Sequence, residues 1–111
     1  MPFMAPRFDQ SLPGNQRKLE LVERLEDVAS KAGVPLPHLA LGFALQHPAV
    51  TSVILGPRTI EQLRELLPGA GVRLDAETLD AIDALVPPAT TLNPADRGWA
   101  PPWMAPPARR R

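Results

Sequence analysis

Apolar residues recur at helical spacing in the first third of the chain. Over residues 15–32 an apolar side chain stands every three or four positions, which places these side chains on one face of a helix. The residues of this face are Leu21, Leu25, Val28 and Ala32. Oppositely charged residues four positions apart support the other face. The pattern predicts a helix over 15–32 that ends at Gly33, because glycine readily takes the left-handed conformation favoured at a helix end.

Two further helices are predicted from their boundary residues. Pro37 fits the first turn of a second helix, and Pro48 brings that helix to an end. Between them the sequence is rich in small and apolar residues, which suits close packing. Asp75 is a suitable cap for a last helix with its own apolar stripe, and Pro87 ends it.

One segment has the character of a strand. Residues 50–55, Val-Thr-Ser-Val-Ile-Leu, form a β-branched run between Pro48 and Gly56. The last three residues are consecutive and apolar, which favours a strand buried on both faces, as in a parallel sheet. A single strand cannot satisfy its own backbone hydrogen bonds. We therefore expect this chain either to be part of a larger α/β fold or to self-associate through the unpaired strand.

The distribution of proline divides the chain into three parts. Ten of the 15 prolines lie in residues 1–17 and 87–111. The sequence therefore predicts a proline-containing loop over 1–17, a periodic middle over 18–86 that supplies the core, and a proline-rich tail over 87–111. The tail holds both tryptophans, Trp99 and Trp103, and ends in three arginines.

Composition excludes several classes of function. The chain carries 12 basic and 12 acidic residues, so it lacks the positive field that nonspecific binding to nucleic acid or an anionic membrane requires. It contains no cysteine and therefore no disulfide or thiolate metal site. The two histidines, His38 and His47, point in opposite directions on one predicted helix, so no metal site is expected. No secretory signal is visible, and we expect a cytoplasmic protein.

The segment after the predicted strand has the residues of an anion site. Thr59 to Gln62 matches a capping box, in which the threonine hydroxyl accepts from the Gln62 N–H and the glutamine side chain reaches back. Gly56 lets a ligand approach the backbone, and Arg58 can donate two hydrogen bonds to a phosphate. Free N–H groups at the helix start add to this attraction. The alternative is an ordinary capped helix with a solvated arginine.

These residues also resemble a known family. The run SVILGPRTIEQL at 52–63 closely resembles the last barrel strand and the following helix of the aldo-keto reductases. Similar motifs stand in the family's order on both sides, over roughly residues 5–111. Upstream they are Pro6-Arg7-Phe8-Asp9, Asn15, Lys18-Leu19 and Pro37-His38-Leu39-Ala40-Leu41; downstream they are Leu74-Asp75, Ile82-Asp83, Val86-Pro87-Pro88, and Asn93-Pro94-Ala95-Asp96 with Gly98-Trp99.

The resemblance implies a fold and a cofactor. It implies an α/β chain that forms the C-terminal part of a TIM (β/α)8 barrel, mostly helical and with the one parallel-type strand at 50–55. The family reduces aldehydes and ketones with NADPH. By resemblance Gly56, Arg58, Thr59 and Gln62 hold the adenosine end of this cofactor, with Arg58 on its 2′-phosphate. Leu66 departs from the family, because many members carry there an asparagine that contacts the adenine.

The resemblance also implies what this chain lacks. The family's catalytic Tyr, Lys, Asp and His come from the first half of the barrel, and this chain contains no Tyr at all. We therefore expect no catalytic residue here, no activity of the chain alone, and binding of the carbonyl substrate only in the complete protein. A different interpretation is a non-catalytic helical interaction module with a proline-rich tail. The strand at 50–55 separates the two, because a free module has no use for it.

Overall fold

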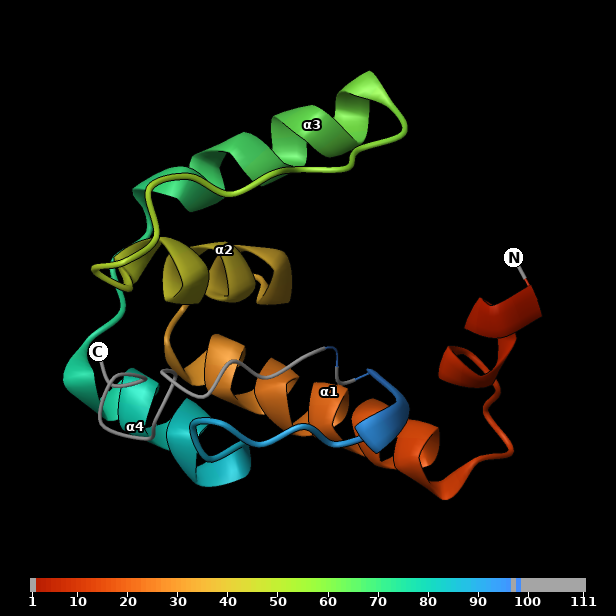
Figure 1. Ribbon diagram of the computed structural model, residues 1–111. Helices are drawn as coiled ribbons and strands as arrows, with labels where there is room; N and C mark the ends of the chain where they lie inside the picture. Colours follow the sequence, from red (N-terminus) through yellow and green to blue (C-terminus); the bar gives the residue numbers. More distant parts are fainter. Residues whose placement is uncertain (1, 97, 99–111) are drawn as a thin grey trace.

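The computed structural model of the protein describes residues 2–96 and 98. Four α-helices follow one another along the chain (Figure 1). They are α1 (Pro13–Lys31), α2 (Leu36–Gln46), α3 (Ile60–Leu66) and α4 (Ala76–Leu85). Three short 3₁₀ helices complete the described secondary structure: η1 (Pro2–Arg7), η2 (Leu67–Gly71) and η3 (Pro94–Asp96). The helices predicted from the sequence are thus all present, although η1 and the start of α1 fall within the stretch expected to be a loop.

The end of α1 follows from its glycine. Gly33 has a φ of 72°, the left-handed conformation that the sequence predicted for this position. Its N–H donates to the Ser30 carbonyl at 3.1 Å, and the Val34 N–H donates to the Ala29 carbonyl at 3.0 Å. These two bonds form a Schellman motif, which satisfies the last carbonyls of the helix and turns the chain toward α2.

A small apolar core joins α1, α2 and α4. Its buried members are Ala29, Leu39, Leu74 and Ile82. The half-buried residues packed against them are Leu25, Val28, Val34, Leu36, Val72 and Leu79. In Figure 1, α1 and α4 lie on one side of α2, and α3 lies on the other side. The core therefore holds three helices together, whereas α3 depends on other contacts.

Those other contacts come from η2, which packs tightly on α2. Gly69 is buried, and a Cβ added there would lie 2.9 Å from Leu41 Cδ1 and 3.2 Å from His38 Cα. Only glycine therefore fits between η2 and α2 without a shift. Next to this contact the His38 Nε2 is 2.6 Å from the Glu65 carbonyl, so the ring ties α2 to the end of α3.

The side-chain amide of Gln46, at the end of α2, bonds to the backbone just before α4 in the way that a neighbouring strand would. Gln46 Nε2 donates to the Leu74 carbonyl at 2.7 Å, and the Leu74 N–H donates to Gln46 Oε1 at 2.9 Å. Leu74 is buried, so its backbone groups need partners inside the protein. The amide of Gln46 satisfies both of them and holds the chain in position just before α4.

Two buried asparagines join both ends of the described chain to α1. Asn15 is 5% exposed and Asn93 is 8% exposed. Asn15 Nδ2 donates to the carbonyls of Pro6 and Asp9, each at 2.8 Å, and Asn15 Oδ1 accepts from Asn93 Nδ2 at 2.9 Å. The N-terminal residues and the segment of Asn93, which is 78 positions from Asn15, therefore meet at the start of α1.

An ion cluster lies beside this asparagine pair. Asp96 pairs with Lys18, and its carboxylate is 3.9 Å from the guanidinium of Arg7. All three side chains are partly exposed, so the asparagine bonds contribute more to stability than these ion pairs do.

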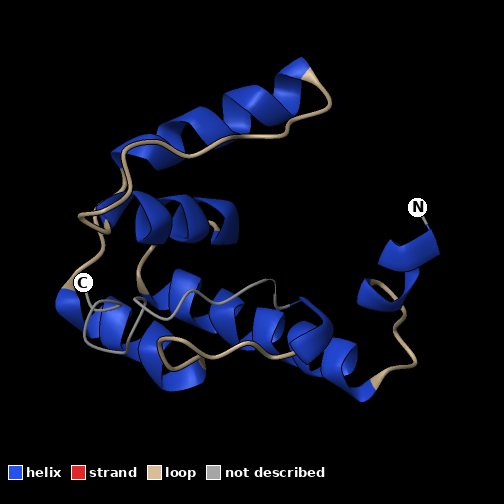
Figure 2. Ribbon diagram, viewed as in Figure 1, coloured by secondary structure: helices blue, strands red, loops and turns tan. Residues whose placement is uncertain are grey.

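The predicted strand at 50–55 is wrong as a description of this chain. No strand is assigned anywhere between residues 2 and 96, and residues 50–57 run as a loop (Figure 2). Ile54, which was expected to be buried, is 97% exposed. The reason is physical: a strand requires a neighbouring strand for its hydrogen bonds, and the described residues supply none.

Among the described residues no single helix is long and apolar enough to cross a bilayer. The pair Pro13–Lys31 and Leu36–Gln46 meets those requirements only when taken together across a bend of 84°.

The asparagine pair yields a stability prediction. We expect Asn93→Ala to lower the free energy of unfolding by about 1–3 kcal/mol, because it leaves the buried Asn15 Oδ1 without a donor. The exposed Thr91→Ala, in the same segment, serves as a control with little effect. Urea denaturation followed by circular dichroism measures both. Equal stability of the two variants would contradict a structural role for the pair.

The cap of α4 yields a pH prediction. Asp75 Oδ1 accepts from the Thr78 N–H at 2.8 Å, and this bond, together with the Thr78 hydroxyl, lowers the pKa of the Asp75 carboxyl. Because the folded-state pKa is lowered, the stabilisation is complete above the unfolded pKa of about 3.9 and is lost as the pH falls below it.

The test compares the wild type with two variants, each of which has an amide in place of one carboxyl group, at pH 6 and pH 3. Asp75→Asn keeps a good cap without a titrating group, so its stability should fall less than that of the wild type over this interval. Glu77→Gln removes a charge in the same turn without touching the cap and should follow the wild type. Denaturation midpoints give the comparison, and parallel losses for wild type and Asp75→Asn would refute the linkage.

Candidate functional site

The four residues predicted to bind a cofactor lie together at the start of α3: Gly56, Arg58 and Thr59 precede the helix, and Gln62 lies in its first turn. Thr59 caps the helix with extended backbone, and its Oγ1 accepts from the Gln62 N–H at 3.2 Å. Gln62 Oε1 accepts from the Arg58 N–H at 2.8 Å. The predicted capping box is confirmed, with one difference: the glutamine reaches the residue before the cap rather than the cap itself.

These bonds decide which groups a ligand can use. The N–H groups of Arg58 and Gln62 are engaged within the turn and are not available to a ligand. The side-chain groups that remain are the Arg58 guanidinium, the hydrogen of the Thr59 hydroxyl and the Nε2 of Gln62, all of them on exposed residues. All three are donors, and the arginine carries a full positive charge. Their chemistry therefore suits an anionic oxygen, and the turn itself holds their backbones in place.

Open space surrounds Gly56, the first residue of the turn. A Cβ added to Gly56 would meet no heavy atom within 4 Å, and the residue is exposed. The fold of this chain therefore does not require glycine here. The absence of a side chain instead leaves the backbone of Gly56 accessible to a ligand that approaches Arg58.

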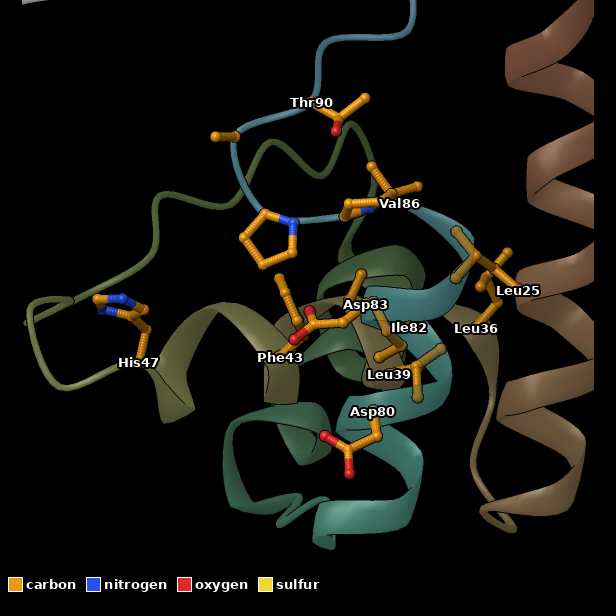
Figure 3. Close-up of a pocket in the computed structure, with 14 residues that line it drawn as sticks. Leu25, Leu36, Leu39, Phe43, His47, Asp80, Ile82, Asp83, Val86 and Thr90 are labelled. Atoms are coloured by element: carbon orange, nitrogen blue, oxygen red, sulfur yellow. The ribbon is translucent and has the colours of Figure 1, made fainter. Parts of the chain in front are cut away.

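A separate groove lies between α2 and α4, away from the turn (Figure 3). Its volume is about 940 Å³. Leu39 and Phe43 from α2 and Ile82 from α4 form part of its apolar lining. Asp80 and Asp83 of α4 add two carboxylates to this lining. Because three helices and the segment after α4 line this groove, no local sequence signal could have revealed it.

The two histidines have separate structural roles. His38 bonds to the end of α3, as described above, and His47 Nδ1 accepts from the Ala49 N–H at 3.1 Å in the turn after α2. Within the described ranges no group of three or more His, Cys, Asp or Glu side chains is placed to hold a metal ion. Trp99, Trp103 and the terminal arginines lie outside the described residues.

Comparison with known proteins identifies the family. The model of the Aldo/keto reductase family matches residues 2–87. The chain belongs to the aldo/keto reductase family. The match includes the turn of Gly56, Arg58, Thr59 and Gln62, and it confirms the resemblance found in the sequence.

Two curated relatives show what share of a whole family member this chain spans. The chain is 31% identical over 84 residues to the uncharacterized oxidoreductase YrpG of Bacillus subtilis (strain 168), covering 76% of this chain and 26% of that protein. It is 43% identical over 42 residues to pyridoxal 4-dehydrogenase of Microbacterium luteolum, covering 38% of this chain and 12% of that enzyme. No solved structure gives a significant match. The chain therefore spans about a quarter of the first relative, as a short part of an aldo/keto reductase.

Proposed function

We propose that this chain is the C-terminal part of an NADPH-dependent aldo/keto reductase and binds the 2′-phosphate of the cofactor through Gly56, Arg58, Thr59 and Gln62. The observation that supports the proposal is that the Arg58 backbone is held in place while its side chain is exposed and, in the described ranges, without a partner. Its backbone is fixed by Gln62, whereas its guanidinium is exposed and has no hydrogen-bond or ion-pair partner among the described residues. A charged side chain without a partner in the part of the chain that the structure describes, at a position within the match to the family, is available to bind an anionic ligand.

The chemistry of the turn supports this role. An arginine presents a planar set of donors that matches the oxygens of a phosphate and binds it with charge-assisted hydrogen bonds. Thr59 and Gln62 can each add one neutral donor. Only NADPH, and not NADH, carries a phosphate at the adenosine 2′ position, so Arg58 would select between the two cofactors. The bound cofactor supplies a hydride, and the residues of this chain bind and orient its adenosine end.

The reaction requires residues beyond this chain. Reduction of a carbonyl needs a proton donor beside the carbonyl oxygen, and the family's tyrosine is absent from this sequence. We therefore propose that earlier barrel strands supply the catalytic residues and the binding site for the carbonyl substrate, and that α1 to α4 take the last positions of that barrel. The cytoplasmic location expected from the sequence stays a prediction.

Binding of two nucleotides to the chain tests the half-site. In ¹⁵N–¹H spectra, adenosine 2′,5′-bisphosphate should shift the amide signals of residues 56–62, whereas adenosine 5′-monophosphate should shift them much less. Arg58→Ala should weaken binding of the bisphosphate about ten- to a hundredfold, because one charge-assisted interaction contributes about 1.5–3 kcal/mol. Gln62→Ala should cost less, since it removes a neutral contact.

The matched control is a nearby arginine outside the turn, Arg64 of α3. Arg64→Ala removes the same charge from α3 without altering the turn, so it should leave the preference for the 2′-phosphate unchanged. Equal losses for both nucleotides in Arg58→Ala would show that Arg58 does not bind the 2′-phosphate. An ordinary capped helix would then describe this turn better.

The absence of tyrosine yields a prediction about activity. The purified 111-residue chain should not oxidise NADPH in the presence of aldehydes, because loss of a positioned acid alone costs about 10²–10⁴-fold in rate. Absorbance at 340 nm measures the reaction, and a preparation from cells lacking the chain corrects for host reductases. Turnover that co-purifies with the chain and is reduced by Arg58→Ala would overturn the prediction.

A further inference from the structure

Residues 51–57 form an extended segment whose backbone is unused. Within the described part of the chain, none of these residues donates or accepts a backbone hydrogen bond. The segment is held at both ends: the Val50 N–H donates to the His47 carbonyl at 3.0 Å, and the Arg58 N–H donates to Gln62. Between these points the N–H and C=O groups are free to bond to another chain.

Burial along the segment alternates with the period of a strand. Val53, Leu55 and Pro57 are half-buried, whereas Ser52, Ile54 and Gly56 are exposed. A two-residue period is that of an extended chain with one face against the protein. Figure 1 shows the segment leading, without a helical turn, from the turn after α2 to the start of α3. The segment thus has the shape of a strand and lacks only a partner.

We propose that, in the absence of the other barrel strands, two copies of this chain pair antiparallel through residues 52–56, with Ile54 of one copy opposite Ile54 of the other. In an extended chain the N–H and C=O of one residue point to one edge, and those of the next residue point to the opposite edge. The proposed edge is the one formed by Ser52, Ile54 and Gly56. Pro57, which has no N–H, belongs to the other edge and does not interrupt this one.

The sequence is self-complementary in this register. Around the central Ile54 pair, Val53 lies opposite Leu55 and Ser52 lies opposite Gly56, so apolar residues meet apolar residues. The next hydrogen-bonded pair would be Val50 with Arg58, whose N–H groups are already engaged, so pairing ends there. The two copies are then related by a two-fold axis, which gives a closed dimer rather than an open chain.

Charge favours the antiparallel arrangement over a parallel one. Residues 50–57 carry no charge, and the whole chain has a net charge of zero, so two copies do not repel each other. In a parallel pair in register the Arg58 side chains of the two copies would stand side by side. In the antiparallel pair they lie at opposite ends of the paired segment.

Two charge variants of one exposed residue test the proposal. Ile54 is 97% exposed, so Ile54→Lys and Ile54→Glu should leave the helical fold intact, which circular dichroism verifies. Sedimentation equilibrium should show a wild-type dimer that dissociates on dilution, and at least about tenfold weaker association for each variant alone, because like charges would face each other. An equimolar mixture of the two variants should associate again, because lysine then faces glutamate.

The control and a second measurement locate the contact. Phe8→Lys changes an apolar residue that is 73% exposed elsewhere in the chain and should leave association unchanged. Hydrogen exchange should show protection of the amides of Ser52, Ile54 and Gly56 at high concentration, and rapid exchange at Val53 and Leu55. A monomeric wild type up to millimolar concentration would overturn the proposal and would favour a strand from the rest of a barrel as the partner. Association of either variant as tight as wild type, or no recovery in the mixture, would also overturn it.

Discussion

The packing of α2 is the contact on which the rest of this structure depends. On one side Leu39 of α2 meets Ala29, Leu74 and Ile82 in the core. On the other side Leu41 and Gly42 of α2 are buried against the 3₁₀ helix η2 and the residues that follow it. A Cβ on Gly42 would lie 3.0 Å from Val72 Cγ1, so a small residue is what allows this approach. A helix that is apolar nearly all round can pack against two neighbours in this way, and α2 joins η2, and through it α3, to the core.

Polar side chains add connections between segments that the small apolar core does not supply. A chain of this size buries little apolar surface, so each connection between segments counts for a larger share of its stability. Gln46 and His38 each bond to the backbone of a distant segment, and Asn15 bonds to the distant side chain of Asn93. Such bonds are directional, because a donor and an acceptor must meet at one distance and angle. They therefore fix where each segment lies on the apolar core.

The sequence predicted what depends on neighbouring residues and failed where distant ones decide. Gly33, the prolines around α2 and the caps Thr59 and Asp75 act within one helical turn, so the helices and the candidate site could be located from local patterns. The bond between Asn15 and Asn93 joins residues 78 positions apart, and no local pattern marks it. Residues 50–55 have the composition of a strand, but composition cannot supply the second strand that the hydrogen bonds require. The groove beside Phe43 was missed for the same reason, because its walls come from different helices.

The unpaired segment and the candidate site are physically linked through Gly56. This residue ends the extended segment and begins the turn that holds Arg58. Ordering a residue of the backbone costs about 1–2 kcal/mol, and in an unpaired segment no hydrogen bonds offset this cost. A neighbouring strand, whether from a second copy or from the rest of a barrel, would fix Gly56 before a ligand arrives. The phosphate binding proposed for the turn would then be tighter than in the isolated chain, although the new strand touches none of the donors. Pairing of the strand and binding at the turn should therefore favour each other, since each one orders the residue on which the other depends.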